Sequence, residues 1–214
     1  MKDLSNYRKS YEKSELLETQ IPEDPINLFH RWFYEAEDLN AAEEVNAMTV
    51  TTIGLDGFPK ARVVLLKKFN EEGFIFYTNY NSEKGKAILN NPNVCLSFFW
   101  PMVERQVIIK GIAEKTPEKI SDNYFASRPD GSKLGAIVSP QSEVIPNREF
   151  LEENLKQLEK EWEGKEILRP AHWGGFLVRP VEVEFWQGRP NRLHDRIRYQ
   201  LTNNYDWKIE RLSP

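Results

Sequence analysis

Short segments with the composition of β-strands fill most of this chain, and turn signals separate them. The segments are rich in Val, Ile, Phe and Thr, which fit the pleated surface of a sheet. We expect strands over residues 47–53, 61–69, 74–78, 94–100, 103–113, 175–178, 181–187, 196–201 and 207–212. The pairs Asp56-Gly57 and Glu72-Gly73 mark turns between the first three strands. Successive strands of hairpin length with few helices predict a mainly β fold, a single antiparallel β-barrel with peripheral helices.

Helical patterns interrupt the strands at four places. We expect helices over residues 24–39, 82–90, 117–127 and 148–162. Asp24 can cap the first of these, with Pro25 in its first turn, and Ser82 can cap the second. The segment 128–146 is rich in Gly, Ser and Pro, so we expect it to be irregular.

The N-terminal segment is polar and charged, and its apolar positions are too sparse to pack by themselves. We expect a flexible arm over residues 1–20, followed by one domain over residues 21–214. Such an arm is either disordered or becomes ordered over a ligand, and the sequence leaves both alternatives open.

Composition argues against some classes of partner. The net charge of −4 is unlike the basic excess of a general nucleic-acid-binding protein, although it allows a local cationic pocket. The lone cysteine, Cys95, lies in an apolar run and cannot form an intrachain disulfide. The first residues lack the apolar core of a signal peptide, and no stretch approaches membrane-spanning length. We therefore expect a cytoplasmic protein without a nucleic-acid or membrane partner.

Several familiar catalytic and cofactor-binding motifs are missing. The chain has no G-x-x-x-x-G-K-[ST] loop and no G-x-G-x-x-G after a predicted strand, so nucleotide binding of those two types lacks support. No G-x-S-x-G elbow suggests a serine hydrolase. The three histidines, His30, His172 and His194, are scattered, and we expect no metal site.

Cationic side chains in or beside predicted strands are the strongest remaining signal. In the run RVVLLK, Arg62 and Lys67 flank four aliphatic residues. Alternation along a strand places these two side chains on opposite faces, so they reach the same spot only if a bulge intervenes. They either reach solvent at the strand ends or hold anionic groups from different sides.

A second cluster combines a tyrosine, an arginine and a serine. Tyr124, Arg128 and Ser132 are spaced at fours across an expected helix end and loop, which suits a phosphate clamp. The alternative is plain helix termination, because Ser-Arg-Pro runs also occur where a helix simply ends.

A third cluster follows a turn over residues 188–191. If the chain is extended beyond that turn, Arg192, His194 and Arg196 share one face, and Leu193 and Asp195 share the other. Three potentially cationic groups on one face repel each other unless a ligand lies between them. The alternative is a solvated edge strand with salt bridges.

Taken in order, these segments resemble the pyridoxamine 5′-phosphate oxidase family. The matching motifs are RVVLLK (62–67), FYTN (76–79), ERQV (104–107), YFASRP (124–129) followed by Ser132, Gln141-Ser142, HWGGF (172–176), EFWQG (184–188), RLHDR (192–196) and WKIERLSP (207–214). They extend from about Arg8 to the last residue. The resemblance implies an FMN-binding split barrel with Greek-key topology, and a homodimer with two active sites at its interface.

The resemblance also implies roles for individual residues. Those expected to contact FMN are Arg62, Val63, Val64, Leu65, Leu66, Lys67, Tyr77, Thr78, Lys84, Gln106, Gln141, Ser142, Trp186 and Arg196. Those expected to contact substrate are Arg8, Tyr11, Lys67, Tyr124, Arg128, Ser132, Arg192, Leu193 and His194. Arg192 and His194 are the expected catalytic residues at the reacting end of the substrate ring. Whether His194 transfers a proton or only orients the ring is left open.

One position departs from the family pattern. The family often has Ser-Arg-Lys after FYTN, and here the run is Ser82-Glu83-Lys84. A carboxylate repels a phosphate, so Glu83 is not expected in the site. We expect Lys84, Arg62 and backbone amides near Ser82 to hold the FMN phosphate, with weaker FMN retention as one consequence.

The reaction implied is oxidation of pyridoxine 5′-phosphate or pyridoxamine 5′-phosphate by O2 to pyridoxal 5′-phosphate, with H2O2 as a product and ammonia from the amine. Two alternatives from other classes remain. One is another split-barrel flavoprotein such as a flavin reductase, and the other is a non-enzymatic protein that binds FMN or pyridoxal phosphate.

Overall fold

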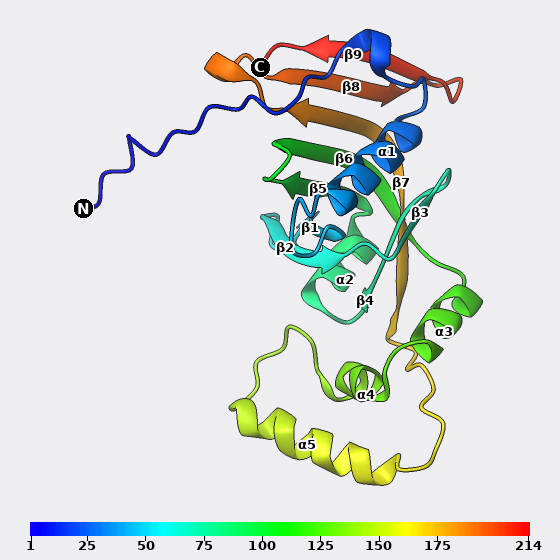
Figure 1. Ribbon diagram of the computed structural model, residues 1–214. Coiled ribbons are helices and arrows are strands. Elements are labelled where there is room, and N and C mark those ends of the chain that lie inside the picture. Colours follow the sequence, from blue (N-terminus) through cyan, green and yellow to red (C-terminus); the bar gives the residue numbers. More distant parts are fainter. The chain divides into compact units, whose positions relative to one another are not determined.

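The computed structural model describes residues 1–214, and its fold is mainly β, as the sequence predicts (Figure 1). The strands are β1 (Ala47–Ile53), β2 (Pro59–Leu65), β3 (Lys68–Asn70), β4 (Gly73–Asn79), β5 (Asn93–Trp100), β6 (Arg105–Lys115), β7 (Trp173–Gln187), β8 (Asp195–Leu201) and β9 (Trp207–Leu212). Hydrogen bonds join them in the order β2-β1-β5-β6-β7-β4-β3, while β8 pairs with β7 and β9 pairs with β8.

Five α-helices and two short 3-10 helices complete the secondary structure. The α-helices are α1 (Pro25–Asp38), α2 (Glu83–Asn90), α3 (Glu118–Ala126), α4 (Asp130–Val138) and α5 (Arg148–Glu161). The 3-10 helices are η1 (Glu18–Gln20) and η2 (Pro190–Arg192). The two predicted caps are confirmed, because Asp24 accepts a hydrogen bond from the backbone N–H of Ile26 and Ser82 accepts one from Gly85. No helix combines the length and the apolar character that crossing a membrane requires.

The chain divides into two compact units. The first comprises residues 1–50, 95–111 and 180–214, and the second comprises residues 51–94 and 112–179. The boundaries at residues 50, 94, 111 and 179 fall inside β1, β5, β6 and β7, so each of these strands contributes residues to both units.

The first unit has an aromatic core between α1 and the strands. Phe29 packs edge-on against Phe98, with ring centroids 5.1 Å apart, and Trp32 packs edge-on against Phe185 at 5.2 Å. All four side chains are buried. Because full burial of a phenylalanine contributes about 1.5–3 kcal/mol, this cluster holds α1 firmly against its neighbours.

The C-terminal strands of the first unit form an antiparallel layer. β8 pairs with the second half of β7, from Glu182↔Gln200 to Gln187↔Asp195, and β9 pairs with β8 over its whole length. Figure 1 shows β7, β8 and β9 side by side, with η1 close to β9. This layer supports the turn between β7 and β8, which carries the third cationic cluster.

The second unit combines strand pairing with a helical cluster. β4 pairs with the first half of β7, from Phe74↔Val178 to Asn79↔Trp173, and β3 pairs with β4. The predicted helix over residues 148–162 corresponds to α5, and its apolar side chains Leu155, Leu158 and Trp162 contact a buried cluster here. The members of that cluster are Phe125, Leu134, Ile167 and Trp173.

The sequence predicts one strand over residues 61–69, and this prediction is wrong. β2 ends at Leu65 and β3 begins at Lys68. At the break, the backbone N–H of Lys67 donates to the carbonyl of Ile75, at 2.9 Å, and the Leu66 side chain is buried. The strict alternation of side chains therefore does not extend from Arg62 to Lys67.

The prediction of an irregular segment over residues 128–146 is wrong for its first half, which forms α4. Asp130 lies in the first turn, and Leu134 is buried against the aromatic cluster. Burial of Leu134 outweighs the low helix propensity of the two glycines in α4, because tertiary packing routinely overrides propensity.

β7 is one strand, although the sequence predicts two that stop on either side of Pro180. Near Pro180, one side of β7 changes its pairing partner. Up to Val178 the partner is β4, and from Glu182 onward the partner is β8. Pro180 lies between these two ladders, so its missing N–H removes none of their hydrogen bonds.

Left-handed residues lie just before two strands. Glu104 has φ 57°, and β6 begins at Arg105 rather than at residue 103. Asn191 and Arg192 have φ 56° and 62° and belong to η2, so the condition that the chain is extended from Arg192 is not met, and β8 begins at Asp195, one residue before the predicted strand. Arg192 and His194 therefore lie on a turn, and the alternation argument does not apply to them.

Candidate active site

The first candidate site is a cavity of about 560 Å³ in the second unit, which we call the Arg128 cavity. Its lining residues are Arg62, Val63, Val64, Leu65, Lys67, Tyr77, Thr78, Lys84, Tyr124, Arg128, Pro129, Ser132, Gln141 and Trp173. Arg62 and Lys67 both line it, contrary to the expectation that they serve different spots, because β2 ends between them. The first and second cationic clusters of the sequence thus meet in one place.

Parallel aromatic rings form part of the wall. Tyr77 of β4 stacks on Tyr124 of α3, with ring centroids 3.9 Å apart and planes inclined by 13°. Tyr77 also lies parallel to Trp173, at 5.6 Å and 8°. Gly175 permits this packing, because a Cβ there would lie 2.9 Å from Cε1 of Tyr77 and 2.7 Å from Oγ1 of Thr116. A stack of this kind offers a flat surface near the cationic groups.

Arg128 follows α3 and points its guanidinium over the aromatic wall. The guanidinium carbon lies 4.5 Å from the ring centroid of Trp173 and 5.6 Å from that of Phe125. The Nη1 atom is buried and has no hydrogen-bond partner. Burial lowers the pKa of Arg128 from its ordinary value, which reflects the cost of desolvating the charge. A buried donor without a partner is unusual, and an anionic ligand in this cavity would satisfy it.

A second cationic pair lies at α2 and the end of β4. Lys84 Nζ donates to Oε1 of Gln141 at 2.9 Å and to Oγ1 of Thr78 at 3.3 Å. Arg62 Nη1 donates to Oγ1 of Thr52 at 2.8 Å. Burial, together with the positive charge of Arg62, lowers the pKa of Lys84 to about 8. The positive charge of Arg62 acts on Lys84 here, and Arg62 and Lys84 both line the Arg128 cavity, so an anion bound there would meet two cations.

Glu83, the residue that departs from the family pattern, is paired with a lysine. Its Oε2 lies 2.5 Å from Nζ of Lys60, a residue of β2. Both side chains are well exposed, at 45% for Glu83 and 56% for Lys60, so solvent screens the pair. The ion pair nevertheless offsets the carboxylate charge beside Lys84.

The second candidate site is a cavity of about 700 Å³ in the first unit, which we call the arm cavity. Its lining residues are Tyr7, Arg8, Lys9, Ser10, Tyr11, Arg189, Asn191, Arg192 and His194. The structure thus brings the predicted arm residues Arg8 and Tyr11 together with Arg192 and His194.

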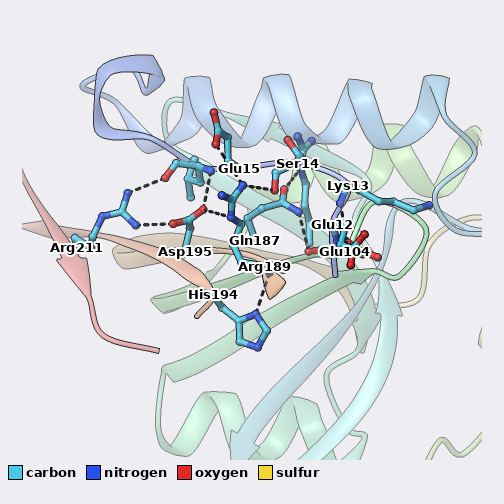
Figure 2. A network of polar contacts seen from close by, with 12 residues as sticks. Glu12, Lys13, Ser14, Glu15, Glu104, Gln187, Arg189, His194, Asp195 and Arg211 are labelled. Atoms are coloured by element: carbon cyan, nitrogen blue, oxygen red, sulfur yellow. Dashed lines mark hydrogen bonds and ion pairs between the residues drawn. The ribbon is translucent and has the colours of Figure 1, made fainter. Parts of the chain in front are cut away.

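His194 is fixed in the arm cavity by one hydrogen bond and two aromatic neighbours. Its Nδ1 accepts from the backbone N–H of Arg189 at 3.1 Å, so the neutral imidazole carries its own N–H at Nε2 (Figure 2). The ring lies 4.7 Å from Trp186 and 5.8 Å from Tyr11, measured between centroids. Burial, and then the charge of Arg192, lowers the pKa of His194. The side chain is therefore mostly neutral at pH 7.

Several predicted site residues lie outside these two cavities. Leu66 is buried, and Ser142 lines a separate cavity of about 300 Å³ together with Gln141. Arg196 forms a two-pronged ion pair with Glu184, at 2.8 and 3.1 Å, which raises its pKa. Leu193 is exposed, Trp186 packs beside His194, and Gln106 lies in β6 within the first unit.

Sequence reasoning missed some of the residues that build the cavities. Trp173 and Pro129 line the Arg128 cavity, and Arg189 lines the arm cavity. Trp173 lies in the motif HWGGF and Pro129 in the motif YFASRP, so the motifs could have indicated both residues as part of the site. Nothing in the sequence marks Arg189 as more than a turn residue.

Comparison with known proteins identifies the family of the chain. The model of the family described as "Pyridoxamine 5′-phosphate oxidase" matches residues 35–161, and that of the "Pyridoxine 5′-phosphate oxidase C-terminal dimerisation region" matches residues 173–214. A Flavobacterium johnsoniae protein named pyridoxine/pyridoxamine 5′-phosphate oxidase is 79% identical over 213 residues, which cover 100% of each chain.

Solved structures support the predicted split-barrel fold. The structure of PhzG from Burkholderia lata 383 in complex with tetrahydrophenazine-1-carboxylic acid has a TM-score of 0.86 and 29% identity, covering 93% of this chain and 98% of that one. A pyridoxamine 5′-phosphate oxidase-related, FMN-binding protein from Nostoc punctiforme shares the fold with a TM-score of 0.71 and 15% identity, over 91% of this chain and 100% of that one. Since the first family model spans more than half of the sequence and a full-length relative is 79% identical, the chain belongs to the pyridoxamine 5′-phosphate oxidase family.

Proposed function

We propose that the chain oxidises pyridoxine 5′-phosphate and pyridoxamine 5′-phosphate to pyridoxal 5′-phosphate, with FMN as cofactor and O2 as electron acceptor. The alcohol and O2 give the aldehyde and H2O2, and the amine consumes one water in addition and releases ammonia. The observation that carries the proposal is the buried Nη1 of Arg128, which has no partner in a cavity that Lys67 and Ser132 also line. Such a group favours a ligand that brings a phosphate.

Lys67, Tyr124, Arg128 and Ser132 would hold the substrate phosphate. The guanidinium of Arg128 and the ammonium of Lys67 supply charge, while the hydroxyls of Tyr124 and Ser132 add hydrogen bonds. Binding energy from the phosphate, which does not react, would then orient the C4′ carbon that does.

FMN fits the remaining features of the Arg128 cavity. Arg62 and Lys84 would hold its phosphate, together with backbone amides near Ser82 at the start of α2. When bound, FMN takes up a hydride equivalent from C4′ and passes the electrons on to dioxygen. The protein's own part is to anchor both phosphates, stack the rings and exclude stray water.

Arg192 and His194 would contact the reacting end of the substrate ring, in a homodimer whose active sites lie at the interface. This assignment is supported by the dimerisation-region model, which spans residues 173–214 and so includes both residues. Trp186, Arg196 and Gln106 would add flavin contacts. Because the pKa of His194 is lowered, the neutral imidazole orients the substrate, with its Nε2–H as donor.

An assay on the purified chain separates this function from its rivals. The flavin spectrum is recorded first, and pyridoxamine 5′-phosphate or unphosphorylated pyridoxamine is then added while peroxide is measured. Peroxide from the phosphorylated amine alone is the expected result. Bound flavin without peroxide would favour a flavin reductase or a carrier, and equal rates with both amines would refute the phosphate clamp.

A further inference from the structure

We propose that Glu104 is a positioning residue for the arm cavity: it holds residues 12 and 13 so that Tyr11 packs against His194 before any substrate binds. The proposal rests on the proposed function in one respect, namely that the arm cavity takes the reacting end of the substrate. Glu104 itself does not line that cavity.

The carboxylate of Glu104 is buried, with the residue only 1% exposed, and its donors come from the arm. Oε2 accepts from the backbone N–H groups of Glu12 at 2.9 Å and Lys13 at 3.1 Å. Oε1 lies 3.3 Å from Nζ of Lys9. A buried carboxylate is strongly unfavourable without such donors, so docking of the arm and burial of Glu104 depend on each other.

The backbone of Glu104 links this anchor to the turn that carries His194. Its carbonyl accepts from the N–H of Gly188 at 2.8 Å and from Nε2 of Gln187 at 3.2 Å. The residue has φ 57°, a left-handed conformation that a non-glycine residue keeps only where its surroundings hold it. One residue therefore faces the arm with its side chain and the β7–β8 turn with its carbonyl.

Gly188 leaves the space that Tyr11 fills. A Cβ at this position would lie 2.8 Å from both Cβ and Cγ of Tyr11, and 3.1 Å from Cβ of Glu104. Gly188 is not among the residues with positive φ, so its backbone accepts alanine without strain. An alanine here would push against Tyr11 without removing any polar group.

A second set of contacts fixes the arm further along. Oδ2 of Asp195 accepts from the N–H of Leu16 at 3.1 Å. Arg211 donates to Oδ1 of Asp195 at 2.8 Å (Figure 2), and it also pairs with Glu18. Arg189 Nη1 donates to the carbonyl of Ser14 at 3.2 Å. Because Asp195 directly follows His194, the Leu16 end of this segment is attached beside the β7–β8 turn, while the Glu12 end is attached to Glu104.

Tyr11 transmits this anchoring to the cavity. Its ring lies edge-on to Trp186 at 5.7 Å and tilted to His194 at 5.8 Å, measured between centroids. The preceding residues, from Tyr7 to Ser10, line the same cavity as Arg192. Release of residues 12 and 13 would therefore remove one wall of the site while leaving Arg192 and the Arg128 cavity unchanged.

The test compares Gly188→Ala and Glu104→Ala with matched controls in the FMN-loaded chain. Gly135→Ala, whose Cβ would meet nothing within 4 Å, and Glu37→Gln, an exposed carboxylate of α1, serve as controls. Hydrogen exchange of the Glu12 and Lys13 amides is measured without substrate. We expect slow exchange in the wild type and in both controls, and exchange faster by about tenfold or more in the two test variants.

Steady-state kinetics give the second readout. We expect KM for pyridoxamine 5′-phosphate to rise by about tenfold in Gly188→Ala, with kcat and FMN content close to those of the wild type. The anchoring would be overturned if the wild-type Glu12 and Lys13 amides exchange as fast as those of a free peptide. It would also be overturned if Gly188→Ala leaves the exchange rate of these amides unchanged. Faster exchange with an unchanged KM would overturn the positioning role. The exchange measurement needs no turnover, so it decides the anchoring even if the proposed oxidase activity fails.

Discussion

The guanidinium of Arg128 lies over the indole of Trp173, with its carbon 4.5 Å from the ring centroid. One face of the cation is thereby covered by an aromatic ring, while the Nη1 atom stays buried without a partner. A cation–π contact of this kind holds the side chain in place without using its hydrogen bonds, which remain available to an anion. Under the proposed function, Arg128 would therefore offer these donors to the substrate phosphate without first breaking other hydrogen bonds.

Replacement of Arg128 tests whether its guanidinium binds the substrate phosphate. We expect Arg128→Ala to raise KM for pyridoxamine 5′-phosphate by about 10- to 100-fold, because a hydrogen bond to a charged group contributes about 1.5–3 kcal/mol. Arg128→Lys should recover only part of the loss, since lysine lacks the planar guanidinium, whose several N–H groups can bind a phosphate while the cation contacts Trp173. Arg148→Ala, an exposed arginine of α5, is the control. An unchanged KM in Arg128→Ala would remove Arg128 from the clamp.

Arg192 should act on turnover rather than on the cofactor. We expect Arg192→Ala to lower kcat/KM for pyridoxamine 5′-phosphate by about 100-fold or more, because it removes a charged contact at the reacting end. FMN content should stay within about twofold of the wild type, because Arg192 lines the arm cavity and not the Arg128 cavity. Kinetics are compared with an FMN titration of the same preparation. Near-normal oxidation in this variant would contradict the assignment.

Lys84 makes FMN binding depend on pH. Its pKa of about 8 in the ligand-free protein means that the charge is largely present at pH 7 and largely lost at pH 9. A bound phosphate raises the pKa of the lysine, so FMN binding takes up a proton above pH 8 and weakens as the pH rises. We expect Kd for FMN to increase by up to about tenfold per pH unit in that range. Lys84→Arg should bind FMN with little change between pH 7 and pH 9, and the same slope in that variant would refute this role.

The Glu83–Lys60 pair should tune the same affinity. We expect Glu83→Gln to tighten FMN binding by about two- to fivefold, because it removes a screened negative charge beside Lys84. Lys60→Ala should weaken binding by a similar factor, since it leaves Glu83 unpaired. The double variant should bind more tightly than Lys60→Ala alone. If the effect of Lys60→Ala is the same with and without Glu83, the pair has no part in cofactor retention.

Much of the fold could be predicted from local sequence signals. The caps at Asp24 and Ser82 and the strands β1 and β9 were predicted because each depends on a short pattern of residues. α4 could not be predicted, because burial of Leu134 decides it and that burial comes from residues distant in the sequence. The continuous strand β7 through Pro180 could not be predicted for a similar reason. A proline is acceptable there only because the strand paired with β7 changes from β4 to β8 at that point.

The sequence predicted many of the residues that line the two cavities, but not how these residues are arranged. Arg62 and Lys67 were expected to serve different spots, and they share a cavity because the strand ends between them. Arg192 and His194 were expected on a strand face, and left-handed residues place them on a turn instead. Glu104 begins the motif ERQV, but the sequence indicates no role for it, because the donors that its carboxylate needs come from residues about 90 positions away.

The central claim is tested most directly by one cycle of reduction and reoxidation. Pyridoxamine 5′-phosphate is added without oxygen to the FMN-loaded chain, the flavin absorbance is followed, and oxygen is then admitted. We expect the yellow absorbance to bleach on addition of the amine, with pyridoxal 5′-phosphate formed in an amount equal to the flavin. Oxygen should then restore the absorbance and yield an equal amount of peroxide. Flavin that stays oxidised in the presence of saturating pyridoxamine 5′-phosphate would contradict the proposed function.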